Sequence, residues 1–195
     1  MSKGAQATNR GRVYVGVDPS YTCTGLAVWK DGQIHLQMEV RTPAKAGTSD
    51  GQRLRRLYEG LLALLRAEKP VLVAIEGYAN DASYRPFAAG EVGGVFRLAC
   101  AVADVPYVIV APSQAKQFAT GDGSASKERV RDAVVSITGT VPTSLDTSDA
   151  FALALIAEAC DLGRSPREKR CEAQVIQTIL HPKPKKPRSK KPFNM

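Results

Sequence analysis

Four carboxylates in this sequence have the types and positions that metal-dependent cleavage of a phosphodiester needs. Asp18 begins a turn after an apolar strand, Glu76 ends a continuous apolar run, and Asp146 and Asp149 lie three residues apart at the start of a predicted helix. Each alone has an ordinary explanation, as a turn residue, a strand end or an acid that complements the helix dipole. Only their meeting at one place would indicate chemistry.

If they meet, four negative charges repel one another and require cations. Carboxylate oxygens with no His or Cys nearby favour Mg²⁺, with Mn²⁺ as a substitute. Two such ions about 3.5–4 Å apart can hold the attacking and the leaving oxygen of an in-line displacement at phosphorus. The sequence therefore predicts a two-metal site, in which Asp146 or Asp149 assists as the general base.

The elements that carry these side chains must place the strands before Asp18 and Glu76 next to each other. The apolar run at 71–75 is typical of a strand covered on both faces, and ligands bind at the carboxyl ends of such strands. Strands that first form a meander and then alternate with helices indicate an α/β fold, with a mixed five-stranded sheet flanked by helices. The predicted strands are 12–17, 23–29, 32–41, 71–75 and 107–110, and the predicted helices are 50–68, 86–103, 112–118, 126–136, 148–163 and 165–180.

Two predicted helices differ in their patterning. In 50–68, leucines recur at helical spacing, and arginines fill much of the opposite face, which we expect to face solvent. The segment 92–102 is apolar almost all round, which fits a buried core helix or part of a subunit interface. The leucines are Leu54, Leu57, Leu61, Leu64 and Leu65, and the arginines are Arg53, Arg55, Arg56 and Arg66.

The formal net charge of +8 is concentrated at the C-terminus. Residues 181–195 hold six Lys or Arg and no acid, so residues 1–180 carry 21 bases against 19 acids. We predict a disordered basic tail at 181–195, which either binds DNA phosphates without sequence preference or serves only to keep the chain soluble. Before it we expect a flexible arm at 1–11, a nuclease domain at 12–163 and a helical extension at 164–180.

The cysteines and histidines argue against other classes of site. Four cysteines lie far apart with no Cys-x-x-Cys pair, and there are two histidines, so neither a zinc site nor a disulfide framework is expected. The N-terminus has no apolar signal segment, and no run approaches the ~18 apolar residues of a membrane span. We expect a cytoplasmic protein with no membrane partner.

Four motifs resemble the RuvC family of Holliday-junction resolvases over about residues 12–160. Each motif is weak alone, but their order and spacing agree with the family. The motifs are Val15-Gly-Val-Asp18-Pro-Ser-Tyr-Thr-Cys-Thr-Gly25-Leu-Ala, Ala74-Ile-Glu76, the stretch from Ala111-Pro-Ser-Gln-Ala-Lys116 through Gly121-Asp-Gly-Ser-Ala-Ser-Lys127, and Asp146-Thr-Ser-Asp149-Ala.

The resemblance implies a ribonuclease H-like fold in which Asp18, Glu76, Asp146 and Asp149 are the catalytic metal ligands, with two Mg²⁺ ions per active site. It implies an endonuclease that resolves Holliday junctions by paired symmetric nicks, leaving 5′-phosphate and 3′-hydroxyl ends. It also implies a homodimer, because a two-fold symmetric enzyme can act on both equivalent strands of a four-way junction.

The resemblance also points to residues that bind DNA. Lys116 and Lys127 fall on the family's DNA-contacting lysines, and Lys127 follows a flexible loop that opens a helix, where a phosphate can bind. Bacterial members place a base-stacking aromatic three residues after the glutamate, where this chain has Ala79. Tyr78 and Arg85, near that position, are predicted as further DNA-binding residues.

Two departures resemble bacteriophage-encoded relatives. Ser20 stands where the family's first turn usually has Gly, and the extension after 164 has no counterpart in compact bacterial members. Some phage relatives are less strict about which branched DNA they cut, so three-way junctions, flaps and forks are candidate substrates. A phage-encoded chain would act in the cytoplasm of the host.

Two other functions stay open on the sequence. The actin-like and sugar-kinase group shares the fold type and an Asp-containing phosphate turn, but its members need two domains around the nucleotide, and 195 residues hardly supply them. The other is a module that binds branched DNA without cutting it. The presence of all four acids argues against that second alternative.

Overall fold

The centre of the protein is a mixed five-stranded sheet, as the sequence predicts. This computed structural model describes residues 11–42, 50–77, 86–165 and 167–182. The strand order is β3-β2-β1-β4-β5; β1, β2 and β3 form an antiparallel meander, and β4 and β5 run parallel to β1. The strands are β1 (Val13–Asp18), β2 (Cys23–Lys30), β3 (Gln33–Arg41), β4 (Leu72–Glu76) and β5 (Tyr107–Val110).

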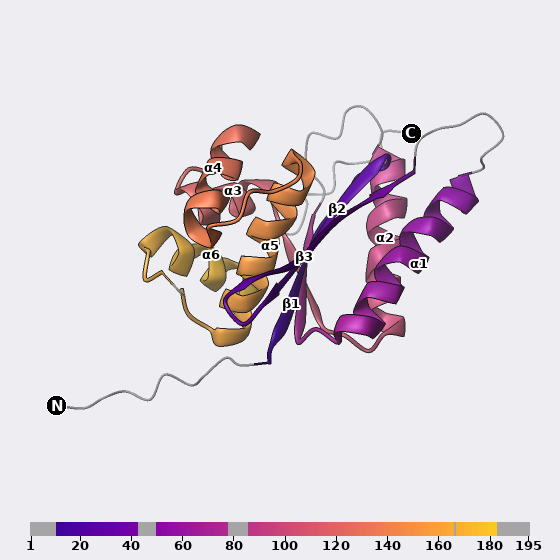
Figure 1. Ribbon diagram of the computed structural model, residues 1–195, viewed down its shortest axis with the longest axis horizontal. Coiled ribbons are helices and arrows are strands. Elements are labelled where there is room, and N and C mark those ends of the chain that lie inside the picture. The colour runs from indigo at the N-terminus through magenta and orange to yellow at the C-terminus, as the bar shows by residue number, and fades with distance from the viewer. Residues whose placement is uncertain (1–10, 43–49, 78–85, 166, 183–195) are drawn as a thin grey trace, which may run out of the picture.

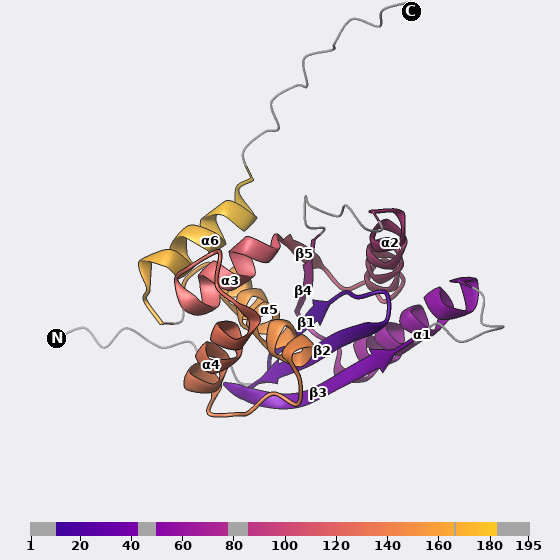
Figure 2. The ribbon, with the colours of Figure 1, turned by 90° about the horizontal axis from the view of Figure 1, so that it is seen from above.

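Helices cover both faces of this sheet. Helices α1 and α2 lie on one side, and α5 lies against the other with α3, α4 and α6 around it (Figures 1 and 2). Side chains of β1 alternate between the two cores, so Tyr14 packs on the α5 side while Val15 and Val17 pack on the α1 side. The helices are α1 (Asp50–Glu68), α2 (Pro86–Val102), α3 (Pro112–Thr120), α4 (Lys127–Thr138), α5 (Leu145–Leu162) and α6 (Arg170–Leu180).

In helix α1 the leucines lie where the sequence predicts, but one arginine does not. Leu57, Leu61 and Leu65 are each 1% exposed or less and face the sheet. Arg53 was expected on the solvent face, but it is only 4% exposed. The prediction was wrong because the first turn of α1 lies over the turn between β1 and β2, where the Arg53 side chain contacts Tyr21.

Two helix starts differ from the predicted ones. Helix α5 begins three residues earlier than expected, because Ser144 is its N-cap and accepts a hydrogen bond from the backbone N–H of Thr147. Asp146 therefore lies inside the first turn. Helix α6 begins at Arg170 instead of 165, because the Ser165 hydroxyl and Arg167 bind the buried Glu172.

The predicted ends of the chain lie largely outside the described residues. Residues 1–10 and 183–195, which cover most of the predicted arm and tail, are not described. Helix α6, in the predicted extension, packs against α3 and α5. Among the described residues, no helix combines the length and apolar character needed to cross a lipid bilayer.

Candidate active site

Two neighbouring parallel strands place Asp18 and Glu76 side by side. In the register of β1 and β4, Val17 lies opposite Ile75, and each carboxylate is the next residue along its strand. Asp18 is only 6% exposed, and the two carboxyl groups share a hydrogen bond. The predicted pairing at the carboxyl end of the sheet is confirmed.

Two glycines let α5 lie directly on the sheet and carry the other two acids to this place. A Cβ atom at Gly25 would lie 2.2 Å from the backbone oxygen of Asp146, and one at Gly16 would lie 1.9 Å from that of Ala150. No side chain larger than hydrogen fits at either position without a backbone shift. This role was not predicted from the sequence, although Gly inside a strand is a known signal of close backbone approach.

Lys127 joins the acids of α5 at the start of α4. Its Nζ atom lies 3.2 Å from Asp146 Oδ1 and 3.1 Å from Asp149 Oδ2. Asp149 in turn acts electrostatically on Asp18 and Glu76, so the four carboxylates form one cluster. Ser126 caps α4 by accepting a hydrogen bond from the Arg129 backbone, which fixes the helix end that carries Lys127.

Of the predicted DNA-binding residues, the structure places two lysines at this cluster. Lys116, on α3, acts electrostatically on Glu76 and Asp149. Lys127 was expected to hold a DNA phosphate, and here its ammonium group is paired with two carboxylates. Tyr78 and Arg85 lie outside the described residues.

Burial and mutual repulsion perturb the carboxylates. Burial raises the pKa of Asp18 well above its usual value, and the nearby Glu76 and Asp149 raise it further. Burial also raises the pKa of Glu76 and of Asp149. Burial acts to lower the pKa of Lys127, but the negative charges of Asp149 and Asp18 outweigh it and raise that pKa. The cluster thus holds more negative charge than its lysines balance.

The donor set of this cluster fits hard divalent cations. All four groups are carboxylates. Protein sites for Mg²⁺ or Mn²⁺ typically offer such oxygen ligands, and the excess negative charge of the cluster attracts these cations. No three of the four acids bring oxygens within 4.8 Å of one another, and the Lys127 ammonium lies against both Asp146 and Asp149. Binding of cations would therefore displace that ammonium group and draw the carboxylates together.

A cysteine thiol also lies near the acids. The expectation that no Cys lies near them was therefore wrong. Ligand atoms of Cys23, Glu39 and Asp146 all lie within 4.8 Å of one another. Both carboxylates already have basic partners, since Glu39 pairs with Arg41 and Asp146 with Lys127. Burial raises the pKa of Cys23 to about 11, so its thiol is protonated at neutral pH in the metal-free protein.

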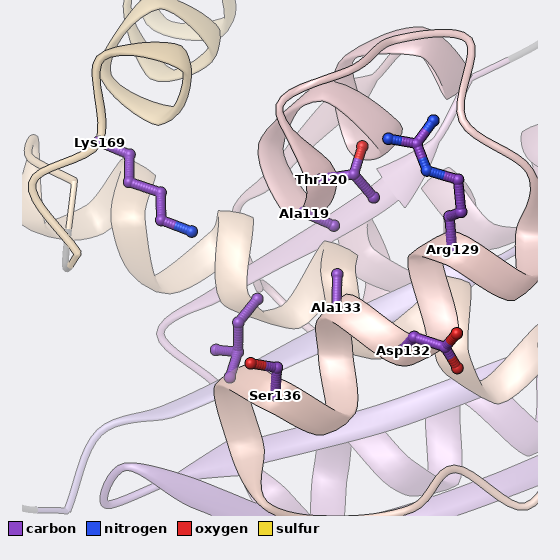
Figure 3. Close-up of a pocket in the computed structure, with 8 residues that line it drawn as sticks. Ala119, Thr120, Arg129, Asp132, Ala133, Ser136 and Lys169 are labelled. Atoms are coloured by element: carbon purple, nitrogen blue, oxygen red, sulfur yellow. The ribbon is translucent and has the colours of Figure 1, made fainter.

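A separate pocket of about 380 Å³ lies between α3, α4 and the segment before α6 (Figure 3). Lys169 and Arg129 line it together with Asp132, Thr120 and four uncharged side chains, those of Ala119, Ala133, Ser136 and Ile137. Arg129 already pairs with Asp122 at 2.7 Å. None of the four clustered acids lines this pocket, so we place the candidate active site at the strand ends.

Comparison with known proteins agrees with this geometry. The family model described as Crossover junction endodeoxyribonuclease RuvC matches residues 14–157. The chain belongs to the RuvC family. The resemblance inferred from the four motifs is thus confirmed, and all four acids, Lys116 and Lys127 lie within the matched range. This family match argues against the alternative of an actin-like or sugar-kinase enzyme.

Relatives and solved structures of RuvC match most of this chain. A Crossover junction endodeoxyribonuclease RuvC of Frankia alni is 36% identical over 168 residues, covering 82% of each chain. The Thermus thermophilus RuvC structure has a TM-score of 0.67 and 28% identity, covering 78% of this chain and 98% of that one. T. thermophilus RuvC in complex with Holliday junction substrate has a TM-score of 0.66 and 27% identity, covering 76% and 94%. The expected ribonuclease H-like RuvC fold is confirmed.

Proposed function

We propose that this chain is a metal-dependent endonuclease that resolves Holliday junctions, with Asp18, Glu76, Asp146 and Asp149 as its metal ligands. The observation that carries the proposal is the meeting of four acids from β1, β4 and α5 at one end of the sheet, in a member of the RuvC family. The T. thermophilus RuvC bound to a Holliday junction substrate supports a branched DNA as the partner.

The proposed cofactors are two Mg²⁺ ions per site, with Mn²⁺ able to substitute. When bound, such ions activate the attacking water and stabilise the leaving 3′-oxygen, which yields 5′-phosphate and 3′-hydroxyl ends. We propose that Asp146 or Asp149 accepts the proton of that water. Lys127, released from these acids, and Lys116 are then free to bind phosphates of the DNA. Tyr78 and Arg85 stay predictions as further DNA contacts.

The proposed assembly is a homodimer formed through α1 and α2. An apolar groove of about 230 Å³ runs between these helices and is lined by Leu54, Tyr58, Val95 and Leu98, with Arg55. Leu98 is 55% exposed and Val102 is 49% exposed, which is unusual for large apolar side chains on one helix. A second copy is the occupant we favour, because a two-fold dimer presents two active sites to the two equivalent strands of a junction.

A panel of labelled DNA substrates tests this function. The purified chain is incubated with Mg²⁺ or Mn²⁺ and four-way, three-way, flap, fork or linear DNA. We expect symmetric paired nicks in the four-way junction that a ligase can seal, and no cleavage in EDTA. Retention of the junction on a native gel with no metal-dependent nicks would favour the non-cleaving module instead. Equal cutting of linear DNA would contradict selectivity for branched DNA.

A further inference from the structure

Arg53 is a buried cation in the first turn of α1. It is 4% exposed, and no carboxylate pairs with it in the part of the chain that the structure describes. Among the described residues, its Nε atom has no hydrogen-bond partner. Removing a guanidinium from water without an acidic partner costs free energy. The buried position of Arg53 is therefore not explained by an ion pair, and its other contacts indicate its role.

Those contacts converge on Tyr21. The guanidinium carbon of Arg53 lies 3.7 Å from the centre of the Tyr21 ring, and its Nη2 donates a hydrogen bond of 2.6 Å to the Tyr21 carbonyl. The Thr42 hydroxyl donates to the same carbonyl at 2.9 Å, and the Tyr21 hydroxyl donates to Asp50. Helix α1 and Thr42, the residue after β3, thus hold the ring, the carbonyl and the hydroxyl of Tyr21.

Tyr21 lies in the turn that directly follows Asp18. The backbone N–H of Ser20 donates to the Thr24 hydroxyl at 3.2 Å, and that hydroxyl donates to the Ser20 carbonyl at 3.1 Å. Asp18 itself pairs with Gly25 in the register of β1 and β2. The chain around Asp18 is therefore anchored by the sheet and Thr24 within the hairpin, and by Arg53 from outside it.

We propose that Arg53 is a positioning residue of the active site, which fixes the Asp18 carboxylate beside Glu76 by clamping Tyr21. This inference rests on the proposed role of Asp18 as a metal ligand. A lysine cannot replace the clamp, because only the planar guanidinium both stacks on a ring and donates in a fixed direction. The next residue, Leu54, lines the groove of the proposed dimer, so one turn of α1 contacts both that face and the catalytic turn.

The test compares Arg53→Lys and Tyr21→Leu with Arg56→Lys, a control at an exposed position of the same helix. Mg²⁺ binding to the DNA-free protein is measured by calorimetry, and the Mg²⁺ dependence of four-way junction cleavage is measured in parallel. Residues that orient metal ligands typically contribute about 10–100-fold in affinity. We expect both clamp variants to raise the Mg²⁺ Kd and the half-activating Mg²⁺ concentration about tenfold or more, while the rate at saturating Mg²⁺ is largely retained.

The control should match the parent in every measurement. Parent-like Mg²⁺ binding by folded Arg53→Lys and Tyr21→Leu, even with a lowered Tm, would overturn the inference and leave Arg53 a packing residue. If Arg53→Lys fails to fold, Tyr21→Leu decides, because Tyr21 is partly exposed and its loss opens no deep cavity. Failure of the proposed function looks different, since the parent itself would then bind no Mg²⁺ or Asp18→Asn would cleave as the parent does.

Discussion

Gly25→Ala is the substitution whose effect follows most directly from the packing of α5 on the sheet. A Cβ atom there would lie 2.2 Å from the Asp146 oxygen, whereas ordinary contacts begin near 3.4 Å, so the first turn of α5 must retreat by about 1.2 Å. Overpacking of this kind costs about 1–3 kcal/mol, and each kcal/mol lowers the Tm by roughly 2–4 °C in a domain of this size. A displacement of catalytic groups by about 1 Å costs on the order of 10²-fold in rate.

The assay for Gly25→Ala is the initial rate of four-way junction nicking at saturating Mg²⁺, with the Tm of the same samples. We expect a rate about 100-fold below that of the parent and a measurably lower Tm. Gly51→Ala is the matched control, because a Cβ atom there has nothing within 4 Å and lies in a helix, where Ala is favoured over Gly. A parent-like rate and Tm for Gly25→Ala would show that α5 does not lie this close to β2.

Three further predictions concern stability, assembly and DNA affinity. Because burial raises the pKa of Asp18, the native state keeps the Asp18 proton to a higher pH than the unfolded chain does, and stability falls as the pH rises from the unfolded to the native pKa. Asp18→Asn should therefore raise the metal-free Tm at pH 8 but not near pH 4. Identical pH profiles of Tm for parent and variant would refute this. Leu98→Glu with Val102→Glu should convert the proposed dimer to monomers, so an unchanged mass by light scattering would exclude that interface. Deleting 183–195 removes six basic residues. The slope of log affinity for the junction against log salt concentration should then become shallower by up to about 5. The same slope in both proteins would mean that the tail does not contact DNA.

The sheet and α1 could be predicted because their signals are local. The continuous apolar run of β4 indicated a strand covered on both faces, and the leucine spacing gave the bounds of α1. The start of α5 was misplaced because Ser144 pairs with Thr147, whereas the usual capping box has Glu or Gln at that position.

The contacts at the site that could not be predicted from the sequence join distant segments. Arg53 reads as a solvent-facing helix residue until Tyr21, 32 positions away, is placed against it. Lys127 reads as a phosphate ligand, and only the fold shows that its ammonium reaches Asp146 and Asp149. The sequence names the charged groups, but their pairing depends on how α4 and α5 pack on the sheet.

Asp149→Asn tests whether the four clustered acids carry out metal-dependent cleavage. The variant keeps the size of the side chain and removes the charge that faces Lys127 and the other acids. Parent and variant are compared for binding of a four-way junction in EDTA and for nicking of it in Mg²⁺. We expect junction binding to be retained and the rate of paired nicking to fall by at least about 10³-fold, as for a group that acts in the transition state. Cleavage by Asp149→Asn at the rate of the parent would contradict this role of the acids.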